Sequence, residues 1–98
     1  MRFVLLFTES AAADLAKIKH SPHLGKRFKA VSKALKYLSE NPRHPGLNTH
    51  EFTSLKGPNK EKVYEAYAEN NTPGAYRIFF YYGPERQEMT VVSIIPHP

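Results

Sequence analysis

Three residues of this 98-residue chain combine the side-chain chemistry and the setting that proton transfer beside a phosphate would need. Arg77 lies in a strongly aromatic stretch, and its guanidinium can give a phosphate two parallel hydrogen bonds. His97 and His50 carry the side chain that titrates near neutral pH, so either could act as an acid or a base. The alternative for Arg77 is structural, an ion pair across a sheet with Glu65 or Glu69.

Nearby lysines and tyrosines mainly offer binding. Lys56, Lys60 and Lys62 form a cluster that could hold a nucleic-acid backbone, and each phosphate neutralised in this way makes binding depend on salt. Tyr64, Tyr81 and Tyr82 could stack bases or donate protons. The alternative for the lysines is a solvated loop, and the alternative for the tyrosines is ordinary packing in the core. The histidines show no metal-ligand spacing, so we expect no metal and no cofactor.

The positive charge of the chain is concentrated in one part of the sequence. Residues 15–62 hold eleven Lys and Arg against three acidic residues, a local net charge of +8, whereas the whole chain carries +5. A segment of this kind suggests a polyanion or an acidic protein as partner, the alternative being a solvated lysine-rich helix face. The chain has no cysteine, which excludes a disulfide framework and a thiol nucleophile.

The length fits one domain, residues 1–98. The first apolar run, residues 3–7, is far shorter than the roughly 20 residues of a membrane helix. It also lacks the small-residue cleavage site of a signal peptide. We therefore expect a soluble, cytoplasmic protein without a membrane partner, in which residues 2–7 form a strand buried on both faces.

Helical periodicity follows that strand in two segments. Residues 10–19 place Ala11, Leu15 and Ile18 on one face, beginning near a capping residue, Thr8 or Ser10. Residues 23–40 carry a longer apolar stripe. The turn between the segments is so short that it predicts an antiparallel hairpin. The stripe consists of Leu24, Phe28, Val31, Leu35 and Leu38.

Residues 41–60 are rich in proline, glycine and asparagine and are predicted to form a long irregular loop. Three strands are expected afterwards, at residues 62–69, 75–82 and 89–95, spaced closely enough for an antiparallel meander. The predicted class is α+β with the order β-α-α-β-β-β. Its sheet should be mainly antiparallel, with the helical hairpin packed on one face.

This order resembles the RelE/ParE toxin superfamily, and local patterns add to the resemblance. An apolar first strand runs into a helix with few bulky residues, and Leu55-Lys56-Gly57 precedes a strand, as Leu-(Lys/Arg)-Gly often does in these toxins. The stretch Tyr76-Arg77-Ile78-Phe79-Phe80 is similar to the family's Tyr/His-Arg-(Leu/Ile)-x-(Tyr/Phe) strand. His97 closes the last strand, as a histidine does in several RelE-like nucleases.

The resemblance implies the toxin of a type II toxin–antitoxin pair, an endoribonuclease that cuts mRNA on the ribosome without a metal and so inhibits translation. Arg77 would then clamp the scissile phosphate, and His97 or His50 would move a proton. An acidic antitoxin would wrap the basic surface. Two alternatives share the fold: a ParE-like protein that poisons DNA gyrase through its helical hairpin, and an inactive partner-binding module.

The spacing of the candidate residues gives a further expectation. Counted from a turn at residues 83–86, Arg77 and His97 lie about five positions out of register, or about 16 Å at 3.3 Å per residue. Direct contact between them is therefore not expected. The site should span the end of the sheet, or draw in His50 and Lys56 through the loop.

Overall fold

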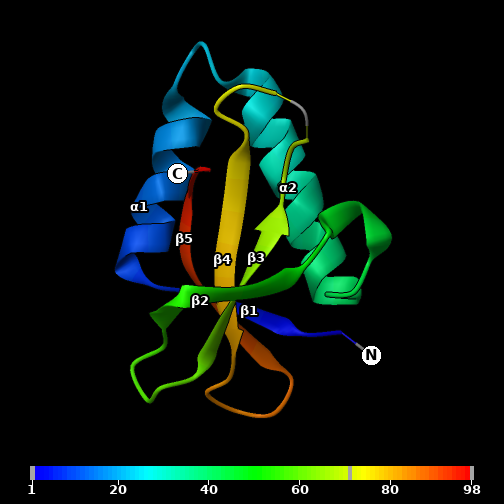
Figure 1. The fold of residues 1–98 in the computed structure, drawn as a ribbon. Coiled ribbons are helices and arrows are strands. Elements are labelled where there is room, and N and C mark those ends of the chain that lie inside the picture. The colour runs from blue at the N-terminus through cyan, green and yellow to red at the C-terminus, as the bar shows by residue number, and fades with distance from the viewer. Residues whose placement is uncertain (1, 71, 98) are drawn as a thin grey trace.

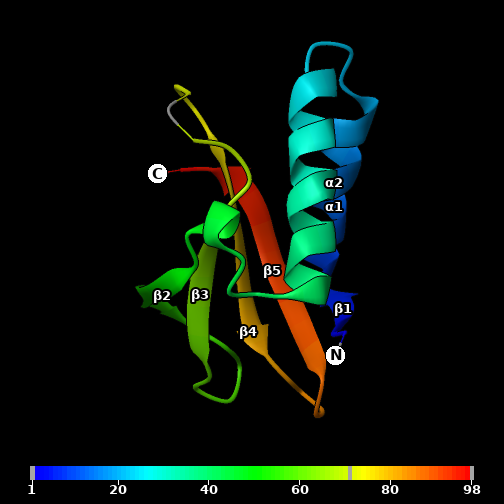
Figure 2. The same ribbon diagram turned by 90° about the vertical axis from the view of Figure 1, so that its right-hand side faces the viewer.

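The computed structural model describes residues 2–70 and 72–97, which form two layers. Figures 1 and 2 show two helices on one face of a five-stranded sheet, with no helix of the described chain on the other face. This arrangement confirms the predicted α+β class and the helical hairpin on one face. The elements are β1 (Val4–Phe7), α1 (Glu9–His20), α2 (Gly25–Glu40), a 3-10 turn η1 (Pro45–Leu47), β2 (His50–Lys56), β3 (Lys62–Tyr67), β4 (Tyr76–Tyr82) and β5 (Glu88–Pro96).

The sheet has the strand order β1-β5-β4-β3-β2. All neighbouring strands are antiparallel except β1 and β5, which run parallel. The prediction that the first strand is buried on both faces is wrong. Because β1 lies at the edge of the sheet, Val4 is 56% exposed and Phe7 is 39% exposed.

The helices begin and end close to their predicted limits. Thr8 caps α1 by accepting a hydrogen bond from the Ala11 amide at 3.0 Å, and α2 ends before Asn41-Pro42. α1 and α2 run antiparallel (Figure 1). The predicted stripe of α2 is buried at Val31, Leu35 and Leu38, while its first two members, Leu24 and Phe28, are half-buried.

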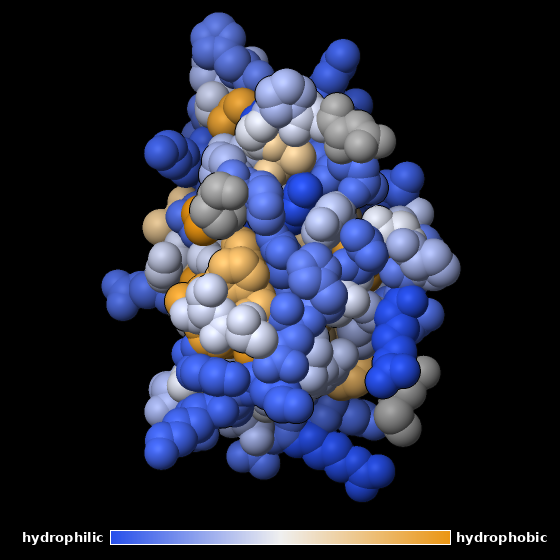
Figure 3. Space-filling model, in the orientation of Figure 1, coloured by the Kyte–Doolittle hydropathy of each residue, from blue (hydrophilic) through white to orange (hydrophobic). Residues whose placement is uncertain are grey.

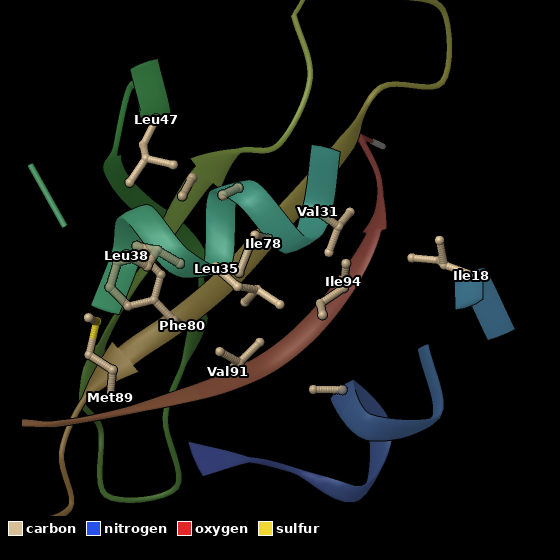
Figure 4. Close-up of a cluster of buried hydrophobic side chains, with 13 residues drawn as sticks. Ile18, Val31, Leu35, Leu38, Leu47, Ile78, Phe80, Met89, Val91 and Ile94 are labelled. Atoms are coloured by element: carbon tan, nitrogen blue, oxygen red, sulfur yellow. The ribbon is translucent and has the colours of Figure 1, made fainter. Parts of the chain in front are cut away.

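The main core lies between the helices and the inner face of β4 and β5. Figure 4 shows the stripe of α2 facing side chains of both strands, with Ile18 of α1 beside them. Alternation along β4 sends Ile78 and Phe80 into this core and Phe79 to the opposite face. The fully buried side chains from the strands include Ile78, Phe80, Met89, Val91 and Ile94.

The prediction of an irregular loop over residues 41–60 is wrong for its second half. His50–Lys56 forms β2, which the proline and glycine content around it concealed. Asn48 adopts the left-handed conformation, with φ of 47°, just before the strand begins. In Figure 1, β2 crosses in front of β3 and β4 on the face without helices. There Phe52 packs edge-on against Phe79 at 4.9 Å between ring centroids, forming a second small core with Val63 and Tyr81.

An extra residue in β5 shifts its register with β4. Phe79 pairs with Ser93 but Phe80 pairs with Val91, so Val92 forms a bulge. The Thr8 hydroxyl donates to the Val92 carbonyl at 3.1 Å, which ties the bulge to the start of α1. Neither α1 nor α2 combines the length and the apolar character that a membrane span would need.

Candidate active site

The centre of the candidate site is a buried carboxylate, Glu65, on β3. Its side chain is only 2% exposed and lies on the face of the sheet without helices. The pairing register of β3 with β2 and β4 explains which residues surround Glu65. Glu65 pairs directly with His50 of β2 and with Phe79 of β4, so the two strands deliver side chains to it from both sides. Three basic side chains converge on this one carboxylate: His50, Arg77 and His97.

His97 binds Glu65 through one ring nitrogen. Its Nδ1 lies 3.0 Å from Glu65 Oε2, and its main-chain amide donates to the Ala75 carbonyl at 2.8 Å. A carboxylate can only accept, so the proton of this bond lies on Nδ1, and the neutral ring then keeps a lone pair on Nε2. With 49% of the side chain exposed, His97 has the form of an oriented base: one nitrogen fixed by a carboxylate, the other open to a substrate.

His50 is held at both ring nitrogens. Its Nε2 lies 2.8 Å from Glu65 Oε1, and its Nδ1 lies 2.9 Å from the Asn48 carbonyl oxygen. Both partners are acceptors, so the two bonds form together only when each nitrogen carries a proton. The ring also meets Tyr67 edge-on at 5.7 Å between centroids. His50 is therefore fixed beside Glu65 and offers no free ring nitrogen to a substrate.

Arg77 lies beneath the carboxylate, with a side chain only 9% exposed. Its Nε is 3.6 Å from Glu65 Oε2, Nη1 donates to the Glu69 carbonyl at 2.7 Å, and the guanidinium carbon lies 3.7 Å from the Tyr67 ring centroid. Within residues 2–70 and 72–97, Nε is the one buried side-chain nitrogen or oxygen without a hydrogen bond. Nη2 makes no hydrogen bond with a described residue either, so it is a candidate for holding a phosphate oxygen.

The expected separation of Arg77 and His97 is wrong. Arg77 pairs with Ile95, and His97 bonds opposite Ala75, so the two lie two positions out of register, not five. Tyr82 pairs with Met89, so the connection takes up two residues more than expected, and the bulge at Val92 takes up one more, which together reduce the offset from five positions to two. Both side chains consequently reach the same oxygen of Glu65.

The other predicted binding residues lie apart from Glu65. Lys56 pairs with Glu51 at 3.8 Å, and Lys60 and Lys62 lie at or beside the turn joining β2 and β3. Lys62 is three residues from Glu65 along β3, or about 10 Å. These lysines therefore flank the site at one end of the sheet.

The three tyrosines that we proposed as base-stacking residues also lie away from the carboxylate, and Tyr82 packs on Phe80 on the helix side of the sheet. Tyr64 neighbours Glu65 in β3 and so points to the helix side of the sheet, where its ring stacks on Phe80 at 5.8 Å. Tyr81 is 7% exposed and belongs to the second small core, so it has little surface left for stacking a base.

Sequence reasoning placed Glu65 only as a structural partner of Arg77 and did not single out Tyr67. One signal was available. Along β3 a carboxylate falls between Val63 and Tyr67 on the same face, and a charge on a largely apolar face is seldom left without partners. The sequence did not reveal β2, the strand that supplies His50.

Figure 3 shows the face that carries the site, in the orientation of Figure 1. Hydrophilic residues cover most of it, and small hydrophobic patches lie near its middle. Among the described residues, no three His, Cys, Asp or Glu side chains gather as a metal site would require. The geometry places the Glu65 carboxylate among the exposed His97, the fixed His50 and the Arg77 guanidinium, on a surface open to a large substrate.

Comparisons with known proteins address the fold. No protein-family model matches the chain, and no curated protein has a significantly similar sequence. The YoeB/ParE toxin from Agrobacterium tumefaciens is similar in structure over 100% of both chains, with a TM-score of 0.71 and 13% identity. A YoeB dimer from Staphylococcus aureus is similar over 100% of both chains, with a TM-score of 0.69 and 15% identity.

An archaeal structure extends this likeness. The RelE–RelB complex from Pyrococcus horikoshii OT3 includes a chain similar to this one over 98% of this chain and 96% of that one, with a TM-score of 0.64 and 12% identity. At such identities the likeness concerns the fold, and at that level it confirms the resemblance drawn from the sequence. The chain thus has the fold of the YoeB/ParE and RelE toxins.

Proposed function

We propose that this protein is the toxin of a type II toxin–antitoxin pair and that it cuts mRNA on translating ribosomes, in the cytoplasm. The observation that carries the proposal is the Glu65–His97 pair, in which a buried carboxylate fixes Nδ1 and leaves Nε2 at the surface. The likeness to YoeB/ParE and RelE toxins supports it at the level of fold.

The proposed reaction is an internal transfer within RNA. His97 Nε2 removes the proton of a 2′-hydroxyl, whose oxygen attacks the neighbouring phosphorus while the bond to the 5′-oxygen breaks. Arg77 Nη2 stabilises the negative phosphorane. Glu65 keeps the His97 ring in the tautomer and orientation that the step needs.

His50 is assigned a positioning role, because both of its nitrogens are engaged. Within the described residues His97 is then the one histidine of the cluster with a free ring nitrogen. The leaving 5′-oxygen would take its proton from solvent or from the ribosome, and the ribosome would hold the RNA against this open face. Lys56, Lys60 and Lys62 would contact the RNA backbone nearby.

A second candidate function rests on the burial of the cluster. Glu65 is 2% exposed and Arg77 9%, values that also suit a purely structural ion cluster. The protein would then act by binding alone, as a gyrase-binding toxin of the ParE kind or as an inactive module.

Both candidates are tested by giving the purified protein mRNA on translating ribosomes and, in parallel, a gyrase supercoiling assay. We expect cleavage by the wild type and its loss in Glu65→Gln. Since removing one partner of a buried pair costs about 3–5 kcal/mol of stability, folding of this variant is checked by circular dichroism. Inhibition of supercoiling without any RNA cleavage would favour the binding function.

The proposed partner is an acidic antitoxin segment on the basic surface. The excess of positive charge in residues 15–62 supports this, together with the similarity to a RelE protein whose structure contains RelB. Such a segment would be partly disordered when free and would lose conformational entropy on binding.

A further inference from the structure

A second concave site lies on the opposite face of the sheet. A pocket of about 480 Å³ is lined by the α2–β2 connection and by the ends of β3 and β4. Tyr64 is adjacent to Glu65 in sequence, and Tyr82 is five residues beyond Arg77, so both tyrosines point away from the Glu65 cluster. The pocket is therefore separate from the proposed catalytic face.

The aromatic wall of the pocket is fixed. Tyr64 and Tyr82 meet edge to face, with ring centroids 5.4 Å apart, and both rings pack on Phe80 of the main core. Tyr82 nevertheless remains 39% exposed. The two rings thus present a partly open aromatic surface on a rigid base, which suits the flat face of a nucleobase.

The polar wall supplies a cation without a partner. Arg43 is exposed, and its side chain makes no hydrogen bond or ion pair with any described residue. Arg43 lies near enough to Tyr82 to oppose the rise that burial causes in the pKa of the Tyr82 hydroxyl. The guanidinium and the phenol therefore share one space, in which an arginine is free to bind a phosphate bidentately.

The connection that carries Arg43 is held in place by its own hydrogen bonds. His44 Nδ1 accepts from the Gly46 amide at 3.0 Å, and the His44 ring stacks on Tyr37 at 4.1 Å. A neutral His44 consequently carries its proton on Nε2, as a donor. The Thr49 hydroxyl donates to the Pro42 carbonyl at 2.8 Å. Figure 2 shows this connection running from the helix layer to the sheet layer.

We propose that this pocket binds a nucleotide, with the base against Tyr64 and Tyr82 and the phosphate on Arg43. The volume falls within the range of about 300–1,000 Å³ typical of small-molecule sites. The nucleotide is either a free mononucleotide or one unit of an RNA strand, since both present the same chemistry. The inference does not depend on catalysis at Glu65.

The test is a binding titration followed by NMR of the ¹⁵N-labelled full chain. The probes are AMP, GMP, CMP and UMP, inorganic phosphate, and a 2′-O-methyl RNA trinucleotide that cannot be cleaved. We expect shifts centred on the pocket with at least one nucleotide or with the trinucleotide. Loss of a charged hydrogen bond in Arg43→Gln should weaken binding about 10-fold to 100-fold.

Matched variants make the result specific. Arg86→Gln removes an exposed arginine from the β4–β5 turn and should leave binding unchanged. Tyr82→Leu should weaken binding, and its spectrum reports whether it folds. Binding by the trinucleotide but by no mononucleotide would identify RNA as the source. The proposal is overturned if no probe binds, if inorganic phosphate binds as tightly as the nucleotides, or if Arg43→Gln binds like the wild type.

Discussion

At the scale of single residues, the arrangement turns on which histidine has a free nitrogen. The sequence does not decide between His97, expected at the end of a strand, and His50, expected in a loop, because either histidine could act as an acid or a base. Their contacts differ: His97 uses Nδ1 alone, whereas His50 uses both nitrogens. Under the proposed function that difference favours His97 as the base, and it could not be seen before the Asn48 carbonyl and Glu65 were placed.

Replacing His97 by alanine should lower the rate of ribosome-dependent cleavage about 10²-fold to 10⁴-fold, the usual contribution of a general base. Because the side chain is half exposed, the melting temperature should change little. Single-turnover cleavage measures the rate, and His23→Ala, which removes an exposed histidine from the α1–α2 turn, is the control. Unchanged cleavage by the His97 variant would transfer the role to His50.

Tyr82 gives a prediction about alkaline pH. Burial, the largest cause, raises the pKa of its hydroxyl above the usual 10.0, and Tyr64 adds to the rise while Arg43 opposes it. As pH rises, the Tyr82 hydroxyl therefore loses its proton in the unfolded chain before it does so in the folded chain. The contribution of this hydroxyl to the free energy of unfolding is complete below pH 10 and is lost as pH rises through the folded pKa. Tyr82→Phe should flatten the decline of stability above about pH 10, measured by urea denaturation across that range. A decline as steep as in the wild type would contradict this origin.

At the scale of elements, the periodicity of apolar residues predicted the helices and strands that pack into the main core. The helices and the three C-terminal strands were predictable because each carries one regular apolar face. β2 was not, because it is mostly exposed and its pairing slips between Glu51 and Lys56. The bulge at Val92 likewise leaves no mark in the residue pattern, yet it helps bring His97 to Glu65.

The apolar stripe of α2 should be the main support of the helix layer. Leu35 is 9% exposed and lies in the core, so Leu35→Ala should cost about 2–5 kcal/mol of unfolding free energy. Lys36→Ala, one position away and exposed, should stay within about 0.5 kcal/mol of the wild type. Equilibrium urea unfolding of both variants checks this, and equal midpoints would contradict the packing.

At the scale of the whole molecule, each of the two faces of the sheet carries a candidate site. The helices cover one side of the sheet, while the other presents the Glu65 cluster on a surface open to a large substrate. The nucleotide pocket lies on the helix side, at the end of α2. Composition alone suggests a polyanion or an acidic partner, but only the sheet register shows where Glu65, His50, Arg77 and His97 meet.

The charge distribution predicts how a partner should bind. An acidic peptide that covers the +8 segment should raise the melting temperature increasingly as its concentration exceeds the Kd, since it binds the folded chain only. Its affinity should fall as salt rises from low to physiological ionic strength, because exposed charges are screened over about 8–10 Å.

Pull-down from the native host at low salt, followed by mass spectrometry, tests for such a partner. A charge reversal on the exposed side of α2, Lys29→Glu with Lys36→Glu, should weaken capture, whereas Arg86→Glu on the far turn should not. Capture that survives the reversal and high salt would show that apolar contacts, rather than the basic surface, hold the partner.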